Sequence, residues 1–342
     1  MKRFALAAAT TLALLPLRPA AAESVVPDAA AWTVRMNVAE AVDSPLGQLV
    51  LRRVRAEAPD FDGMLASLED TIGLNPLDAP GTAVLYGDRF GRGEISLVAE
   101  LTEGSGKLEG WMLALPGYQS EDLEGGQTLL HSFELGEGRG PRDRGDKQNE
   151  GRERRQPRAA DARVFLTLPD VGGRTKLIAS LNRNQALDIP RDLTSGDATL
   201  DGDALPSGRL MAAKLNRIPA RAANSGAPGS AILQSLRTAE LLVSSADSVG
   251  MELDLTTISP ARARQLGQLL TGLQGLAGLA AMEQPELAWT VDMLQGVAVD
   301  SRPDDSRVTA TLNVPTADVE RALDTLIEMD RREKRPMRRR AE

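Results

Sequence analysis

The chain has 342 residues, of which 42% are hydrophobic but only 3% are aromatic, and its net charge is −8. It contains no cysteine and a single histidine, His131, which excludes disulfides, thiol nucleophiles and histidine-rich metal sites. The low aromatic content also argues against stacking platforms for bases or sugars.

The first 22 residues have the pattern of a secretory signal peptide. Lys2 and Arg3 are positive, residues 4–17 are mostly apolar, and Ala20 and Ala22 supply the small side chains that precede a cleavage site. The apolar run is shorter than the roughly 20 residues that a membrane-spanning helix needs. We therefore predict cleavage after Ala22 and a periplasmic or secreted protein.

Strands and helices alternate over the first 135 residues. Residues 31–38 alternate apolar and polar side chains, which predicts a strand with one buried face. Ser44 and Pro45 predict the N-cap and first turn of a helix, and Gly73 predicts the end of a second helix. Further strands are expected at 82–86 and 94–101, a short helix at 108–115, and a hairpin at 118–123 and 127–135.

Residues 137–161 interrupt this pattern. Apart from proline, their only apolar residues are Ala159 and Ala160, so the segment cannot bury enough surface to offset its ordering entropy, and we predict a disordered insertion. Beyond it we expect a hairpin that turns at Gly172 and Gly173, a short helix near 184–187 and a polar loop at 194–208.

The last third of the chain is more regular. A strand is expected at 209–215, a short helix at 230–236 and a hairpin at 239–245 and 249–257. Ser259 and Pro260 predict the start of the longest helix. A second helical stretch at 285–294, a hairpin at 297–301 and 307–314, and a helix capped by Thr316 complete the pattern.

The order of these elements predicts an α+β fold. Residues 31–135 and 209–314 both run strand, helix, strand, strand, helix, strand, strand, so we expect two related lobes of largely antiparallel sheet with helices packed on one face. The predicted organisation is a signal peptide at 1–22, an N-terminal lobe at 23–200 with the insertion 137–161, a C-terminal lobe at 201–330 and a basic tail at 331–342.

Several caps and turns carry a resemblance. They are the strand followed by Ser44-Pro45-Leu46-Gly47, the segment Gly73-Leu74-Asn75-Pro76-Leu77 before a strand, and the late run 259–279 with Gln284-Pro285-Glu286-Leu287 after it. Together they resemble uncharacterised exported proteins of Gram-negative bacteria. The resemblance implies no activity and supplies no catalytic residue.

Three sets of residues were weighed as sites. His131 lies in a predicted strand, and we favour a hydrogen-bonded structural residue over a lone general base. Asp197, Asp201 and Asp203 lack the spacing of a calcium loop and favour a solvated turn. Three glycines recur every third residue on the long helix and favour a close helix approach over flexibility; they are Gly272, Gly275 and Gly278.

No sequence motif indicates a catalytic residue, a cofactor or a metal. We therefore expect a non-catalytic binding or interaction protein of the bacterial envelope, whose partner is an unknown protein or envelope component. The alternative is a periplasmic hydrolase that uses carboxylates in a cleft between the lobes. The tail is a candidate for attachment to an anionic membrane surface. Its basic residues are Arg331, Arg332, Lys334, Arg335, Arg338, Arg339 and Arg340.

Overall fold

The computed structural model describes residues 23–75, 77–78, 80–89, 95–101, 105–123, 129–134, 163–218, 230–283, 293 and 295–325. The predicted signal peptide, the insertion 137–161 and the basic tail 331–342 lie outside these residues, and so does most of the helical stretch expected at 285–294.

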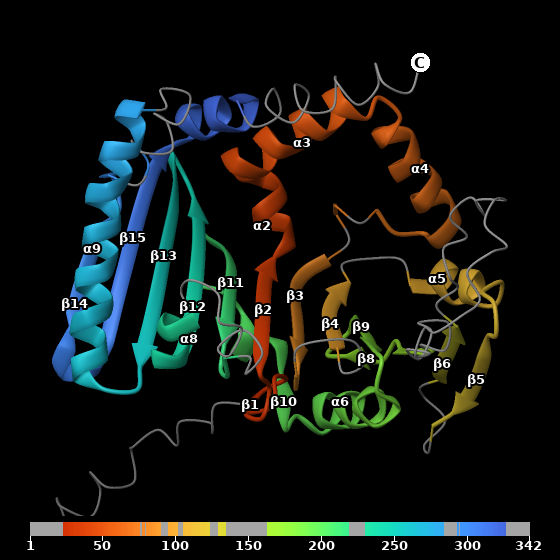
Figure 1. Ribbon diagram of the computed structural model, residues 1–342. Helices are drawn as coiled ribbons and strands as arrows, with labels where there is room; N and C mark the ends of the chain where they lie inside the picture. The colour runs from red at the N-terminus through yellow and green to blue at the C-terminus, as the bar shows by residue number, and fades with distance from the viewer. Residues whose placement is uncertain are drawn as a thin grey trace, which may run out of the picture.

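A long antiparallel sheet organises the described residues and gives the α+β class predicted from the sequence (Figure 1). Every hydrogen-bonded pair of strands within this 13-stranded sheet is antiparallel. From one edge to the other the strands are β14 (Ala298–Arg302), β15 (Arg307–Pro315), β13 (Ser248–Thr257), β12 (Leu236–Ser245), β11 (Arg209–Leu215), β2 (Trp32–Asn37), β3 (Pro80–Gly87), β4 (Ile95–Leu101), β9 (Arg174–Ser180), β7 (Arg163–Thr167), β6 (Leu129–Glu134) and β5 (Gln119–Asp122), and β8 (Asp170–Val171) also pairs with β9.

The strands of both expected lobes join in this one sheet, because β2 pairs with β11 along its length. The sheet therefore has two continuous faces, which we name after one residue on each. Val34 of β2 pairs with Leu85 of β3, so both side chains project from the same face. Val84 is next to Leu85 on β3 and therefore points to the opposite face. We call these the Val34 face and the Val84 face.

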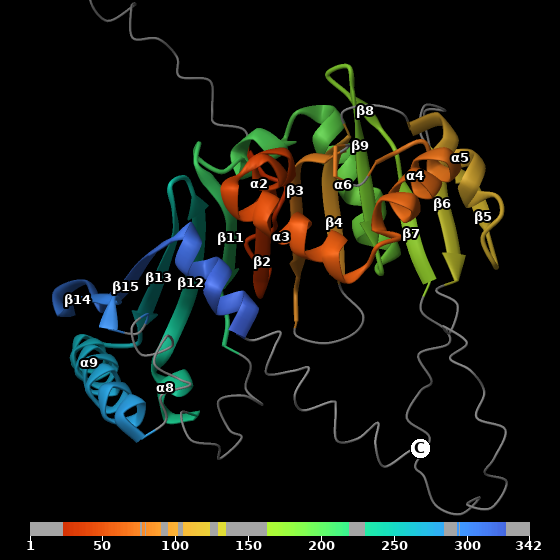
Figure 2. The ribbon, with the colours of Figure 1, turned by 90° about the horizontal axis from the view of Figure 1, so that it is seen from above.

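The helices are divided between the two faces, so the expectation that they pack on one face is wrong. Ile189 and Leu193 of α6 (Arg183–Ser195) pack with Val84 in one core cluster. Ala263 and Leu266 of α9 (Pro260–Glu283) pack in another cluster with residues of β13 and β15 that lie on the Val34 face. α8 (Ser230–Ser235) accompanies α9 (Figure 2).

The N-terminal half also has helices on the Val34 face. Leu108 of α5 (Ser105–Met112) packs with Leu101 of β4 and Leu177 of β9, and Ile72 of α4 (Phe61–Ile72) joins the same cluster. The chain places α6 on the other face of the same strands. This half is therefore a three-layer arrangement at its outer end.

Two of the predicted helix boundaries are confirmed, whereas Thr316, expected as an N-cap, is already within its helix and its hydroxyl donates to the Asp247 carbonyl. The Ser44 hydroxyl accepts a hydrogen bond from the Gly47 amide at the start of α3 (Pro45–Glu57), and Gly73 ends α4 with a φ of 76°. The sequence prediction missed α2 (Val38–Asp43), whose N-cap is Asn37. It also made α6 too short, because this helix continues through Pro190 to a left-handed Gly196.

The remaining described elements lie outside the long sheet. β1 (Glu23–Ser24) and β10 (Ala198–Thr199) form a short parallel pair beside the 3-10 helix η3 (Leu200–Asp203). The 3-10 helix η5 (Pro303–Asp305) joins β14 to β15, and a helix at 316–325 follows β15. Within the described residues, no helix is both long and apolar enough to cross a membrane.

The glycine prediction on α9 is wrong for the residues that can be examined. A side chain added at Gly272 or Gly275 would meet nothing within 4 Å. The close approach is at Gly267 instead, where an added Cβ would lie 3.0 Å from the Cβ of Ser301 on β14. Gly278 is in a part of α9 whose side chains are not described.

Candidate functional site

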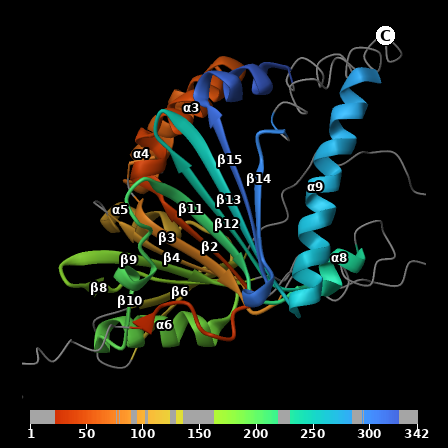
Figure 3. The ribbon, with the colours of Figure 1, turned by 90° about the vertical axis from the view of Figure 1, so that its left-hand side faces the viewer.

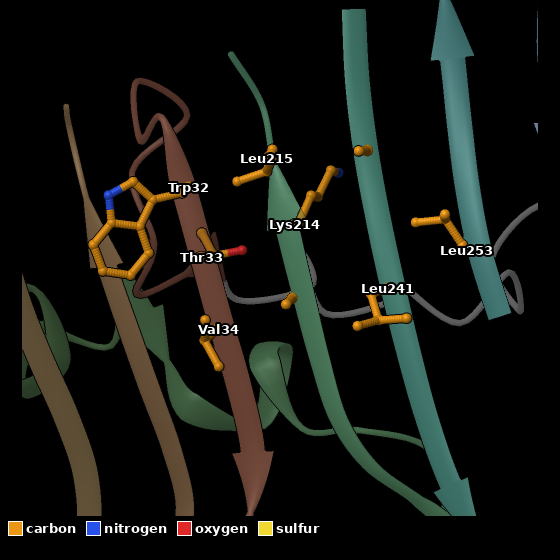
Figure 4. A pocket seen from close by; sticks show the side chains of 9 residues that line it. Trp32, Thr33, Val34, Lys214, Leu215, Leu241 and Leu253 are labelled. Atoms are coloured by element: carbon orange, nitrogen blue, oxygen red, sulfur yellow. The ribbon is translucent and has the colours of Figure 1, made fainter. Parts of the chain in front are cut away.

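An apolar trough lies on the Val34 face over the four central strands β2, β11, β12 and β13 (Figure 4). Its cavity volume is about 340 Å³, which falls within the range of small-molecule pockets. The nine lining residues are Trp32, Thr33, Val34, Ala213, Lys214, Leu215, Ala239, Leu241 and Leu253.

The trough follows from residue size along paired strands. Ala213 of β11 and Ala239 of β12 are small, whereas their cross-strand partners Leu241 and Leu215 are large. Small side chains beside larger ones leave a depression in a sheet surface. The surrounding side chains of Trp32, Val34, Leu215, Leu241 and Leu253 are all half-buried.

Four helices cover the two outer parts of the Val34 face, and α2 contacts the central strands β2, β3 and β11. α8 and α9 pack over β13 and β15, and α4 and α5 pack over the ends of β4 and β9. Figure 3 shows α9 and α8 on the opposite side of the molecule from α4 and α5, which is the expected result of strand twist accumulated across a wide sheet. The central strands lie between these two helical layers.

The chemistry of the trough is that of a hydrocarbon surface. Thr33 and Lys214 pair with each other across β2 and β11, and strand alternation directs both side chains to the Val84 face. The indole Nε1 of Trp32 already donates a hydrogen bond to the carbonyl of Arg89 at 3.1 Å. The side chains that remain can bind an apolar group but offer it no charge or free donor.

A second cavity, of about 580 Å³, lies between α9 and the edge strand β14. Polar side chains of Arg264, Gln268 and Thr271 line it together with Gly272 and Ser301. The Oγ of Ser301 is buried and has no hydrogen-bond partner. Neither this cavity nor the apolar trough is lined by a carboxylate.

The aspartates considered for calcium are not gathered into a metal site. Asp203, expected in a solvated turn, is instead buried and binds the end of β1 and the middle of β2. Its carboxylate accepts hydrogen bonds from Ser24 Oγ (2.6 Å), the Val25 amide (3.0 Å) and Arg35 Nε (2.8 Å). Asp197 accepts from the Ser195 hydroxyl at 2.6 Å. Among the described residues, no group of three or more potential metal-binding side chains occurs.

His131 is a buried structural residue, as its strand position indicated. It lies on β6, is only 2% exposed, and its Nδ1 is 3.0 Å from the hydroxyl of Tyr118. Burial lowers the pKa of the imidazole, although the charge of Glu109 on α5 opposes this effect. The neutral ring is therefore favoured. Among the side-chain hydrogen bonds of the described residues, the ring is joined only to the hydroxyl of Tyr118 and not to a carboxylate.

The carboxylates with shifted pKa values belong to ion pairs and not to a cleft. Burial raises the pKa of Glu100, but hydrogen bonds from Lys176 and Arg174 outweigh it, so the pKa of this carboxyl is lowered. Hydrogen bonding to Arg307 lowers the pKa of Asp254 on the Val84 face. Both carboxylates are held ionised, which suits a structural ion pair better than a general acid.

Comparison with protein-family models, with curated proteins and with solved structures gives no match for this chain. The candidate site therefore rests on geometry and chemistry alone. Sequence reasoning did not find the trough, because its residues come from strands that are far apart in the chain. The only available signal was the alternating pattern of each strand, which recurs in ordinary sheets.

Proposed function

We propose that the chain is an exported, non-catalytic binding protein of the bacterial envelope and that the apolar trough is its binding surface. The observation that carries this proposal is the trough itself, a depression of about 340 Å³ lined by apolar side chains, because ligand pockets of this size are lined mostly by apolar side chains. A hydrolase remains the alternative, but neither cavity supplies the pair of acidic residues that it would require.

The localisation is part of this proposal and rests on the sequence. Residues 1–22 have the features of a signal peptide, and Glu23 would become the new N-terminus. Attachment to an anionic membrane surface through the seven basic residues of 331–342 is a further part of the proposal. Intact-mass measurement of the exported protein, and vesicle binding with and without residues 331–342, test these two parts separately.

We also propose that the two halves of the sheet arose by internal duplication. Outward from the central pair, the strand order is β2-β3-β4-β9-β7 on one side and β11-β12-β13-β15-β14 on the other. Leu85 pairs with Val34 in one half, and Leu241 pairs with Ala213 in the other. With these residues aligned, Thr82-Ala83-Val84-Leu85 matches Thr238-Ala239-Glu240-Leu241.

The central strands support the same alignment. Val34 and Ala213 pair with each other, so a local two-fold axis passes between them and superposes β2 on β11. Arg35 and Asn37 then align with Lys214 and Asn216. The two units extend from β2 to α6 and from β11 to the helix at 316–325, with α5 and α9 in matching positions. The hairpin β5–β6 has no counterpart and would be an addition to the first unit.

A dye-binding experiment tests the proposed binding surface. We expect anilinonaphthalene sulfonate to become fluorescent with the mature protein and Leu241→Asn to lower its affinity about tenfold, since a polar amide in an apolar contact costs roughly 1–3 kcal/mol. Leu242→Asn is the matched control, because Leu242 is the next residue of β12 and faces the charged Val84 face. Equal effects of the two substitutions would contradict the trough as the binding surface.

A further inference from the structure

We propose that the apolar trough is one part of a longer apolar band that binds a single extended hydrocarbon chain of a lipid, laid across the strands of both halves. This inference rests on the proposed binding function and specifies its ligand. The band consists of six side chains in one row across six strands. They are Leu97, Leu85, Val34, Ala213, Leu241 and Leu253.

The row is established by strand register and not by proximity alone. Each member is the direct cross-strand partner of the next: Leu97 of Leu85, Leu85 of Val34, and so on to Leu253. Directly opposite residues in antiparallel strands project from the same face. With neighbouring strands about 4.8 Å apart, the band is about 24 Å long.

The band extends the trough into the N-terminal half. The trough itself includes Val34, Ala213, Leu241 and Leu253, whereas Leu85 and Leu97 continue the row beyond it. Both added residues are half-buried, as are the four trough members, so none of the six is fully covered by the rest of the chain. Under the local two-fold axis, Leu85 and Leu97 occupy the positions of Leu241 and Leu253.

The flanking rows are apolar as well, which isolates the band from charge. Met36 pairs with Met211 on one side of the central Val34–Ala213 pair, and Trp32 pairs with Leu215 on the other. The charged residues of the same strands, such as Arg35, Glu240 and Glu252, alternate with these residues and face the opposite way. A ligand lying along the band would therefore meet hydrocarbon over its whole length.

These features favour a flexible chain over a compact or polar ligand. The depression at Ala213 and Ala239 is small, at about 340 Å³, and it continues as a row one side chain deep. A ring-shaped ligand would use only the depression. An acyl chain can lie in the depression and follow the row outward.

The test is a chain-length series of saturated fatty acids, from octanoate to stearate, measured by displacement of the dye from the mature protein. Each added methylene that is buried should tighten binding about fourfold, which corresponds to ~0.8 kcal/mol. We expect this gain to continue beyond decanoate, because the longer chains would reach Leu85 and Leu97. A hydrocarbon chain that used only the trough would stop gaining affinity at a short length.

Three substitutions locate the chain. We expect Leu97→Asn to weaken palmitate binding about tenfold while it leaves octanoate unchanged, whereas Leu241→Asn weakens both. Leu242→Asn, on the opposite face, should change neither. Leu97→Ala is the second variant at this position, in case the asparagine variant fails to fold. It should also weaken palmitate binding selectively, but by a smaller factor than Leu97→Asn.

The outcomes separate this inference from the proposed function. If Leu241→Asn weakens every fatty acid but neither Leu97 variant affects palmitate, the band is refuted and the trough stands. If the dye binds at the trough but no fatty acid displaces it, the hydrocarbon ligand is refuted. If an amphipathic helical peptide displaces the dye better than palmitate does, the ligand is a protein helix. If neither dye nor fatty acid binds, the proposed function itself fails.

Discussion

The two halves of the sheet use the Val84 face in opposite ways. In the N-terminal half, Val84 and Val98 are fully buried there under α6. At the aligned positions of the C-terminal half stand two carboxylates, Glu240, which is partly exposed, and Asp254, whose side chain is 12% exposed and paired with Arg307. The strand pairing is the same on both sides. The comparison shows that the presence of a covering helix, and not the strand arrangement, decides whether this face is apolar or charged.

On this face the C-terminal half forms cross-strand ion pairs, whereas the N-terminal half buries Val84 and Val98. Asp254 pairs with Arg307 of β15, and Glu252 pairs with Arg209 of β11 at 3.0 Å. Both arginines are partly exposed, and exposed ion pairs typically contribute 1 kcal/mol or less each. The half covered by α6 should therefore be far less tolerant of substitution on this face.

Exchanging aligned residues between the halves gives the largest expected effect. Val84→Glu places a carboxylate in a fully buried core position, so we expect a loss of more than ~4 kcal/mol in the free energy of unfolding or a failure to fold. Glu240→Val removes a half-exposed charge from the other half and should change the same quantity by about 0.5 kcal/mol or less. Urea unfolding followed by circular dichroism measures both.

One outcome of exchanging these aligned residues would contradict the difference between the two halves. Similar losses in the two variants would mean that the Val84 face of the C-terminal half is covered as well. Val98→Asp and Asp254→Val provide a second aligned pair, although removal of Asp254 also leaves Arg307 without this partner. We therefore expect a modest loss for Asp254→Val and a large one for Val98→Asp.

Acid should weaken the edge hairpin β5–β6 before the rest of the sheet. Burial lowers the pKa of His131 on β6, so its unfolded form takes up a proton at a higher pH than the folded form does. Stability linked to this group is thus present above the unfolded pKa of about 6.5 and is lost as the pH falls below it. His131→Gln should make the free energy of unfolding less dependent on pH between about 7 and 5.

Hydrogen exchange can assign this effect to the hairpin. Amides of β5 and β6 should lose protection on acidification in the parent protein, while those of β12 and β13 should not. Equal loss across both halves would show that the pH dependence arises elsewhere. The rest of the sheet would then share the acid sensitivity that we assign to the hairpin β5–β6.

Local features of this fold could be predicted from the sequence, whereas its long-range pairing could not. The Ser44 cap, the Gly73 terminus and the alternation of β2 depend on neighbouring residues and are confirmed. The pairing of β2 with β11 joins residues such as Val34 and Ala213, and no local pattern specifies a partner so far along the chain. The expectation of two lobes did not foresee this contact, which joins their strands in one sheet.

The site residues illustrate the same limit. Asp203 was placed in a solvated turn because its neighbours are polar, yet its carboxylate is buried by Arg35 and the segment at Ser24 and Val25. The apolar trough depends on Ala213 and Ala239 lying beside larger residues of other strands. Residue type in one strand cannot show what stands opposite it. The sequence therefore indicates which face of a strand is apolar, but not whether a helix covers it.

The smallest expected effect concerns the glycines of α9, which packs on the C-terminal half. Gly272→Ala adds a methyl group in open space and removes backbone freedom from the unfolded chain, so we expect the free energy of unfolding to rise by about 0.5–1 kcal/mol. Gly267→Ala gives the same helical gain but brings the new Cβ within 3.0 Å of Ser301. The helix or β14 must then shift, so the substitution should stabilise less than Gly272→Ala or destabilise. Thermal unfolding of the two variants, each compared with the parent, measures this difference. Equal stabilisation would show that α9 does not press on β14 at Gly267, and the helical layer of this half would then be looser than the layer formed by α6.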